Sequence, residues 1–151
     1  MEGKEGSMTD REAAAKDWLS RNEFRWNEIK SLELRLEEMR DQVNKSVAEP
    51  KEICVQTQPR NVQAEKIADI VDFEKKIVDL RKRYELLEKT TVETIEKLRD
   101  PVKVNILLFR YVYHRSWSYI AGKMHYKESY IYALHHKALN SIYPLIDFTA
   151  D

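Results

Sequence analysis

Two long stretches of this sequence contain neither glycine nor proline and carry apolar residues at alternating steps of three and four. In residues 9–47 the repeating positions are Ile29, Leu32, Leu36, Met39 and Val43. In residues 62–99 they are Ile70, Phe73, Ile77, Leu80, Tyr84 and Leu87. This spacing places side chains along one side of a helix, as in the seam of a coiled coil. The pattern predicts two long helices.

The segment between them, residues 48–61, loses the period and contains Pro50 and Pro59, which predicts a loop. Two helices of similar length joined by a short loop are expected to form an antiparallel hairpin over residues 9–99. The same apolar seam also suits pairing between two chains, or could serve both kinds of pairing, and the sequence leaves these alternatives open. Thr9 or Asp10 is the predicted N-cap of the first helix, with Glu12 close behind. Residues 1–8 are expected to be a flexible N-terminus or an expression remnant.

Residues 100–151 are expected to form a separate domain of short helices. Asp100 and Pro101 suit the N-cap and first position of a helix over 101–113, and Ser116 suits the N-cap of a second helix over 117–124. A three-residue break precedes a third helix, 128–143. The side chains predicted to face inward are Val102, Ile106, Phe109 and Tyr113, then Ile120, Ala121 and Met124, then Ile131, Leu134, Ala138 and Ile142. The predicted fold is all-α, a helical hairpin followed by a helix-turn-helix domain.

Charge is distributed unevenly, although the net charge of the chain is zero. Residues 101–146 contain six lysines and arginines, and Glu128 is their only acidic residue. A local basic segment favours a polyanionic partner more than the net charge of the chain suggests.

Several other classes of function find no support in the residues. Cys54 is the only cysteine, which excludes an intrachain disulfide and favours a reducing cytoplasm. The chain has no apolar run long enough for a membrane helix and no glycine-rich phosphate loop. The adjacent His135 and His136 point about 100° apart on a helix and are not expected to share a metal ion. We therefore expect a protein that is not an enzyme, without cofactor, metal or membrane association.

The segment "LLFRYVYHRSWSYIAGKMHYKESYIYALHHKAL" resembles region four of bacterial sigma factors. It is more similar to the C-terminal half of the small phage regulators of the ArpU and RinA type, over residues 100–142. The matching positions are Leu107, Arg110, Tyr111, Val112, Ser116, Trp117, Ile120, Ala121, Met124, Tyr126, Leu134, Ala138 and Leu139, with Ile131 in the place of a valine. The resemblance implies a transcription regulator of phage late genes in the bacterial cytoplasm. It would bind duplex DNA and contact RNA polymerase. A homodimer or higher oligomer is expected as well, since a single small reading head gives limited affinity and site length.

A helix-turn-helix reads DNA through its second helix, whereas other residues contact phosphates. The residues expected to face the bases are Glu128, Ser129, Tyr132, Ala133 and His136. Those expected to face phosphates are Arg110, Arg115, Ser116, Lys123, Lys127, Tyr130 and Lys137.

The segment departs from the phage pattern at the turn and on the reading helix. His125 stands where the pattern has glycine, and Lys127 stands where it has a capping serine. Ser129 and Ala133 replace arginines, although arginine to guanine is the commonest specific contact. The alternative is therefore a protein-interaction module with a degenerate helix-turn-helix that binds RNA polymerase or another phage or host regulator.

Overall fold

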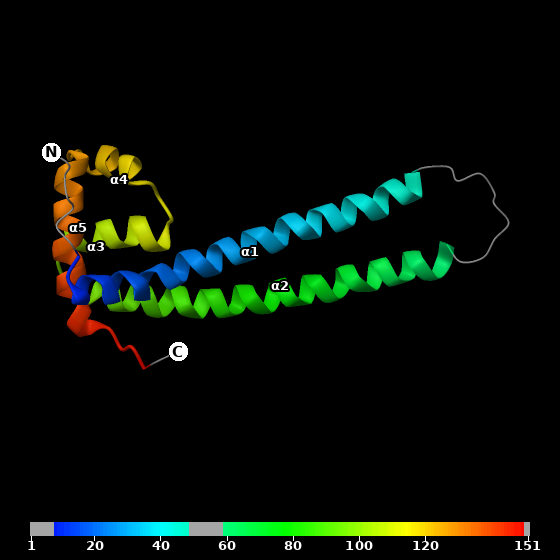
Figure 1. The fold of residues 1–151 in the computed structure, drawn as a ribbon, viewed down its shortest axis with the longest axis horizontal. Helices are drawn as coiled ribbons and strands as arrows, with labels where there is room; N and C mark the ends of the chain where they lie inside the picture. The colour runs from blue at the N-terminus through cyan, green and yellow to red at the C-terminus, as the bar shows by residue number, and fades with distance from the viewer. Residues whose placement is uncertain (1–7, 49–58, 150–151) are drawn as a thin grey trace. The chain divides into compact units, whose positions relative to one another are not determined.

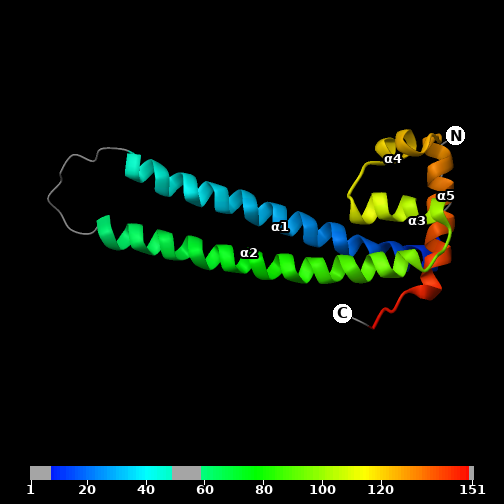
Figure 2. The same cartoon turned by 180° about the vertical axis from the view of Figure 1, so that it is seen from behind.

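The computed structural model describes residues 8–48 and 59–149, and these ranges are helical without any strand (Figure 1). The elements are α1 (Asp10–Ala48), α2 (Pro59–Glu96), α3 (Pro101–Leu107), a π-helical turn (Leu108–Val112), α4 (Trp117–Met124), α5 (Glu128–Ile142) and a 3₁₀ turn (Tyr143–Leu145). The predicted all-α fold, with two long helices followed by shorter ones, is confirmed. Figure 2 shows the same order of elements from behind.

The chain divides into two compact units, and α1 and α2 contribute residues to both. Within the described residues, unit 1 consists of 8–25 and 85–149, and unit 2 consists of 26–48 and 59–84. The division predicted from the sequence falls at residue 100. Unit 1 instead includes the start of α1 and the end of α2.

The ends of the long helices have local causes. At the start of α1, Thr9 N donates to Glu12 Oε2 (2.8 Å) and Glu12 N donates to Thr9 Oγ1 (3.3 Å), which is a reciprocal capping box. The loop predicted over 48–61 includes residues at both of its ends that the structure shows to be helical. Ala48 still belongs to α1, and α2 already begins at Pro59, where proline's missing N–H costs nothing. Residues 49–58 lie outside the described ranges.

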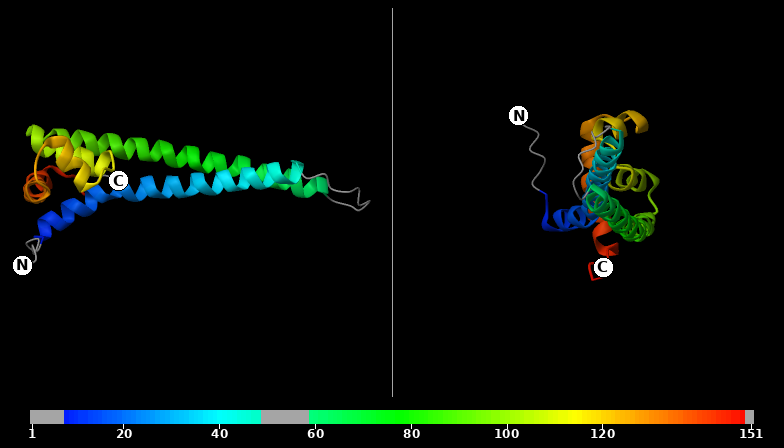
Figure 3. Two further views of the ribbon diagram at one scale, coloured as in Figure 1. Left: turned by 90° about the horizontal axis from the view of Figure 1, so that it is seen from above. Right: turned by 90° about the vertical axis from the view of Figure 1, so that its right-hand side faces the viewer.

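Unit 2 is an antiparallel pair of helices whose seam closes within one chain (Figure 3). Leu32 and Leu36 of α1 are buried against Ile77 of α2. Arg40 Nη2 lies 2.5 Å from Glu74 Oε1 across the pair, and Arg81 pairs with Glu33. Every predicted seam residue, including Leu87 in unit 1, is buried or half-buried. The apolar seam of unit 2 is therefore closed within one chain.

Unit 1 has a first core that joins α5 to the long helices. Leu139 and Ile142 of α5 are fully buried together with Leu19 of α1 and Ile95 of α2. Near this core, Asn22 Nδ2 donates to Thr91 Oγ1 (3.0 Å). Within unit 1, α5 therefore packs on the start of α1 and the end of α2.

A second core in unit 1 holds the helix-turn-helix together. Ile106, Ile120, Ala121 and Ile131 bring α3, α4 and α5 into contact. The predicted inward side chains are buried or half-buried with one exception, Tyr113, which is 54% exposed.

The π-helical turn explains that exception. The predicted α-helix over 101–113 changes after Leu107 to wider turns, in which Tyr113 N donates to Leu108 O (2.9 Å). One extra residue per turn shifts the following side chains around the helix axis. Tyr111 and Val112 consequently enter the core, and Tyr113 leaves it.

The turn between α4 and α5 contains a backbone conformation that favours glycine. His125 is exposed and has φ 61° and ψ 39°, the left-handed region. A Cβ there costs about 1–2 kcal/mol, partly offset by the greater unfolded-state freedom of glycine. We expect His125→Gly to raise the free energy of unfolding by about 0.5–1 kcal/mol, measured by urea titration. Lys123→Gly inside α4 is the control and should lower it by about 1 kcal/mol. Equal stability of His125→Gly and the unaltered chain would contradict the expectation.

Candidate nucleic-acid interface

Local backbone chemistry positions the two helices of the motif. Ser116 Oγ accepts a hydrogen bond from Tyr119 N (3.1 Å) and caps α4, as predicted. Lys127 is the N-cap of α5 and makes no side-chain capping bond, whereas Glu128 places a carboxylate in the first turn. Lys127 therefore places a positive charge beside the start of α5, at the position where the phage pattern has a capping serine.

One side of α5 is exposed to solvent, and we call it the outer face. It consists of Ser129, Tyr130, Ala133 and Lys137. Ser129, Ala133 and Lys137 follow one another at steps of four, and Tyr130 precedes Ala133 by three residues, so these positions share one side of the helix. Tyr126 of the turn lies against Tyr130, with ring centroids 5.0 Å apart in an edge-to-face arrangement. The outer face is therefore small side chains flanked by an aromatic pair and a cation.

The five residues predicted to face bases differ in their exposure to solvent. Glu128, Ser129 and Ala133 are exposed. Tyr132 is half-buried, and its ring meets that of Trp117 edge-to-face at 5.3 Å. His136 is half-buried, with Nδ1 3.5 Å from Glu12 Oε1. The structure thus turns Tyr132 and His136 toward the protein, and places Tyr130 and Lys137 beside Ser129 and Ala133.

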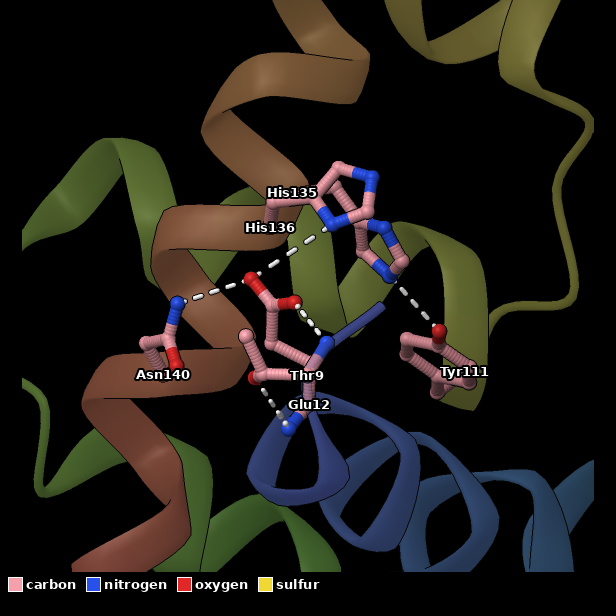
Figure 4. Close-up of polar contacts among 6 residues, drawn as sticks. All are labelled: Thr9, Glu12, Tyr111, His135, His136 and Asn140. Atoms are coloured by element: carbon pink, nitrogen blue, oxygen red, sulfur yellow. Dashed lines mark hydrogen bonds and ion pairs between the residues drawn. The ribbon is translucent and has the colours of Figure 1, made fainter. Parts of the chain in front are cut away.

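Glu12 of α1 connects the start of that helix to α5 (Figure 4). Its carboxylate accepts a hydrogen bond from Asn140 Nδ2 (2.7 Å) in addition to the one from Thr9 N, and it lies beside His136. Burial opposes ionisation of Glu12, but the Thr9 hydrogen bonds and the nearby His136 outweigh it and lower the pKa of the carboxyl. An ionised Glu12 therefore fixes the side of α5 next to the outer face.

His135 is a buried histidine that the sequence reading did not place in the core. Its Nε2 lies 2.6 Å from Tyr111 Oη in a hydrogen bond (Figure 4), and its ring meets Trp117 at 4.6 Å. Burial, with neighbouring positive groups, lowers the pKa of His135 to about 3. Burial also raises the pKa of Tyr111. The position of His135 four residues after Ile131 is the signal that could have identified it as a core residue.

The predicted phosphate contacts also divide into two groups. Arg115, Ser116, Lys123, Lys127, Tyr130 and Lys137 are exposed. Arg110 is half-buried: its guanidinium lies over the Trp117 ring at 4.6 Å, and Nη1 donates to the carbonyl of Arg115 (3.1 Å). Arg110 is therefore engaged in holding the segment before α4.

A cation pair lies over one exposed aromatic ring of α4. The Arg115 guanidinium is 4.7 Å and the Lys123 ammonium 5.9 Å from the centroid of Tyr119. Two positive groups beside a phenol hydroxyl form a surface suited to anions.

Comparisons of the chain with protein-family models, with curated proteins and with solved structures give no match. Within residues 8–48 and 59–149, the structure has no helix long and apolar enough to cross a bilayer.

Proposed function

We propose that the chain binds duplex DNA through α4, the turn and α5, as a transcription regulator of the phage late-gene type in a bacterial cytoplasm. The observation that carries this proposal is the exposed outer face of α5, which includes Lys137, on a helix-turn-helix whose Lys123 and Lys127 are also exposed. Glu128 is the only acidic residue in 101–146. A helix about 10–12 Å across suits a major groove about 12 Å wide.

In this arrangement Lys123, Lys127 and Lys137 neutralise phosphates, and the other residues of the outer face of α5 meet the base edges. Arg115 and Lys123, at the Tyr119 ring, suit contacts to the backbone next to the groove. A homodimer or higher oligomer remains part of the proposal, since one small head reads only a short site. In unit 2 the predicted seam is already filled within the chain, so self-association would use another surface.

The test of this proposal replaces Lys123, Lys127 and Lys137 together by alanine. Each lost phosphate contact removes a released counterion, so the slope of log affinity against log salt should fall by up to about 3. We expect the affinity at about 0.15 M salt to fall at least about tenfold. Fluorescence anisotropy with a labelled duplex at several salt concentrations measures both quantities.

The matched control replaces Lys66, Lys75 and Lys76 by alanine, which are exposed on α2 in unit 2. It removes the same charge from a different surface. If both triple variants lose the same affinity, the effect reflects net charge, and the basic side of the helix-turn-helix is not the binding site.

The second candidate is a protein-interaction module that binds RNA polymerase or another phage or host regulator. Two observations favour it: no arginine lies on the outer face of α5, and Tyr113 is 54% exposed, with its ring and that of Tyr119 both next to Phe109. Exposed tyrosines and arginines are frequent anchors of protein interfaces. Absence of duplex binding at low salt, together with capture of purified RNA polymerase, would favour this candidate over the first.

A further inference from the structure

The chemistry of the outer face limits what it can recognise. Arginine or lysine suits guanine, and asparagine or glutamine suits adenine. The exposed part of the first two turns offers none of these: it begins with Glu128, whose carboxylate suits the amino group of cytosine, and continues with Ser129, Tyr130 and Ala133. Asn140 lies near the other end of α5 and is held by Glu12. The middle of the outer face is thus a methyl group beside an aromatic ring.

Tyr130 is held in place by its neighbour. Its ring is packed edge-to-face on Tyr126, and the two side chains remain 50% and 41% exposed. An aromatic pair of this kind reduces the rotamer freedom that binding would otherwise have to remove. Ala133 lies on the same side, three residues after Tyr130. The two side chains together form a small apolar patch, which we call the Tyr130–Ala133 patch.

The apolar group that the major groove offers is the 5-methyl of thymine. We propose that the Tyr130–Ala133 patch recognises thymine methyl groups, so that the chain prefers a duplex site containing neighbouring A·T pairs. This inference rests on the proposed DNA-binding function. It requires no arginine on α5, because contact with a methyl needs shape and apolar surface rather than hydrogen bonds. Ser129 supplies a hydroxyl at the edge of the patch for one polar contact.

The experiment compares two duplexes that differ only in this methyl. The unaltered chain first selects binding sites from a random duplex pool, and the selected site is then prepared with thymine or with deoxyuridine. Uracil keeps the base pair and loses the methyl. Burial of one methyl-sized group corresponds to about fourfold in affinity, so loss of two should weaken binding by about tenfold or more.

Two exposed substitutions locate the effect. Ala133→Gly and Tyr130→Ser remove parts of the patch, and each should lower the ratio of thymine to uracil affinity toward one. Lys137→Ala is the matched control on the same face. It should weaken binding to both duplexes equally and leave the ratio unchanged. The ratio of thymine to uracil affinity is measured with the same variant on both duplexes. A change in the folded fraction of that variant affects both affinities equally and cancels in the ratio.

The outcomes separate this inference from the function on which it rests. Equal affinity for the two duplexes, or selection of sites without neighbouring A·T pairs, overturns the thymine assignment and leaves DNA binding intact. If both patch variants still bind the uracil duplex more weakly, the difference in affinity arises from duplex shape. That result also overturns the assignment of the thymine contact to the Tyr130–Ala133 patch. Failure to bind any duplex at low salt overturns the proposed function itself.

Discussion

A fragment of residues 100–151 is expected to be largely unfolded in isolation at about 25 °C, although it contains every helix of the helix-turn-helix. Ala138, Leu139 and Ile142 of α5 are fully buried in a core that includes Leu19 of α1 and Ile95 of α2. Removal of the long helices exposes this side of α5. Each fully buried leucine or isoleucine contributes about 1.5–3 kcal/mol, a large share of the 5–15 kcal/mol by which domains are typically stable.

A shortened chain provides the comparison. In it, residues 26–84 are replaced by a short glycine–serine linker, which retains the α1 and α2 segments of unit 1. We expect this chain to be helical by far-UV circular dichroism and to unfold cooperatively in urea. A cooperative transition of the isolated 100–151 fragment would contradict the expectation, because the three short helices would then be sufficient.

The heptad pattern predicted the hairpin well because a coiled-coil seam is a local property. Residues such as Leu32, Leu36 and Ile77 are buried by the repeat in which they stand. The same kind of pattern correctly predicted the inward sides of α4 and α5. Periodicity identifies a buried side without identifying its partner, so the packing of Leu139 against Leu19 and Ile95 was not predictable.

The candidate site was predicted only in part. The N-cap at Ser116 and the exposed Ser129 and Ala133 follow from residue type and helical spacing. The surroundings of Tyr132 and His136 depend on contacts with Trp117 and with Glu12, which is 124 residues before His136. Polar side chains can be satisfied on either side of a helix, so their placement requires the tertiary structure.

Acidification is expected to destabilise the chain through His135. Its folded pKa of about 3 lies below the unfolded value of about 6.5, so the unfolded state binds more protons between these limits. The stability associated with neutral His135 is therefore complete above about pH 6.5 and is lost as the pH falls. Between about pH 7.5 and 5.0 the loss is about 2 kcal/mol, measured by urea unfolding at each pH.

His135→Gln is the variant that isolates this effect, since glutamine can bond Tyr111 Oη but does not titrate. Burial of His135 is the main cause of its lowered pKa, and His136, Lys16 and Arg110 act in the same direction, against Glu12. All four of these neighbours remain in the variant. Burial also lowers the pKa of His114, which adds to the acid sensitivity of both chains equally.

The difference between the two chains in their loss of stability therefore reports His135 alone. We expect the variant to lose about 2 kcal/mol less than the unaltered chain between the two pH values. Identical pH dependence would mean that imidazolium is accommodated at this position. The packing of His135, stacked on Tyr111 and edge-to-face with Trp117, would then not be what keeps the imidazole neutral in the folded chain.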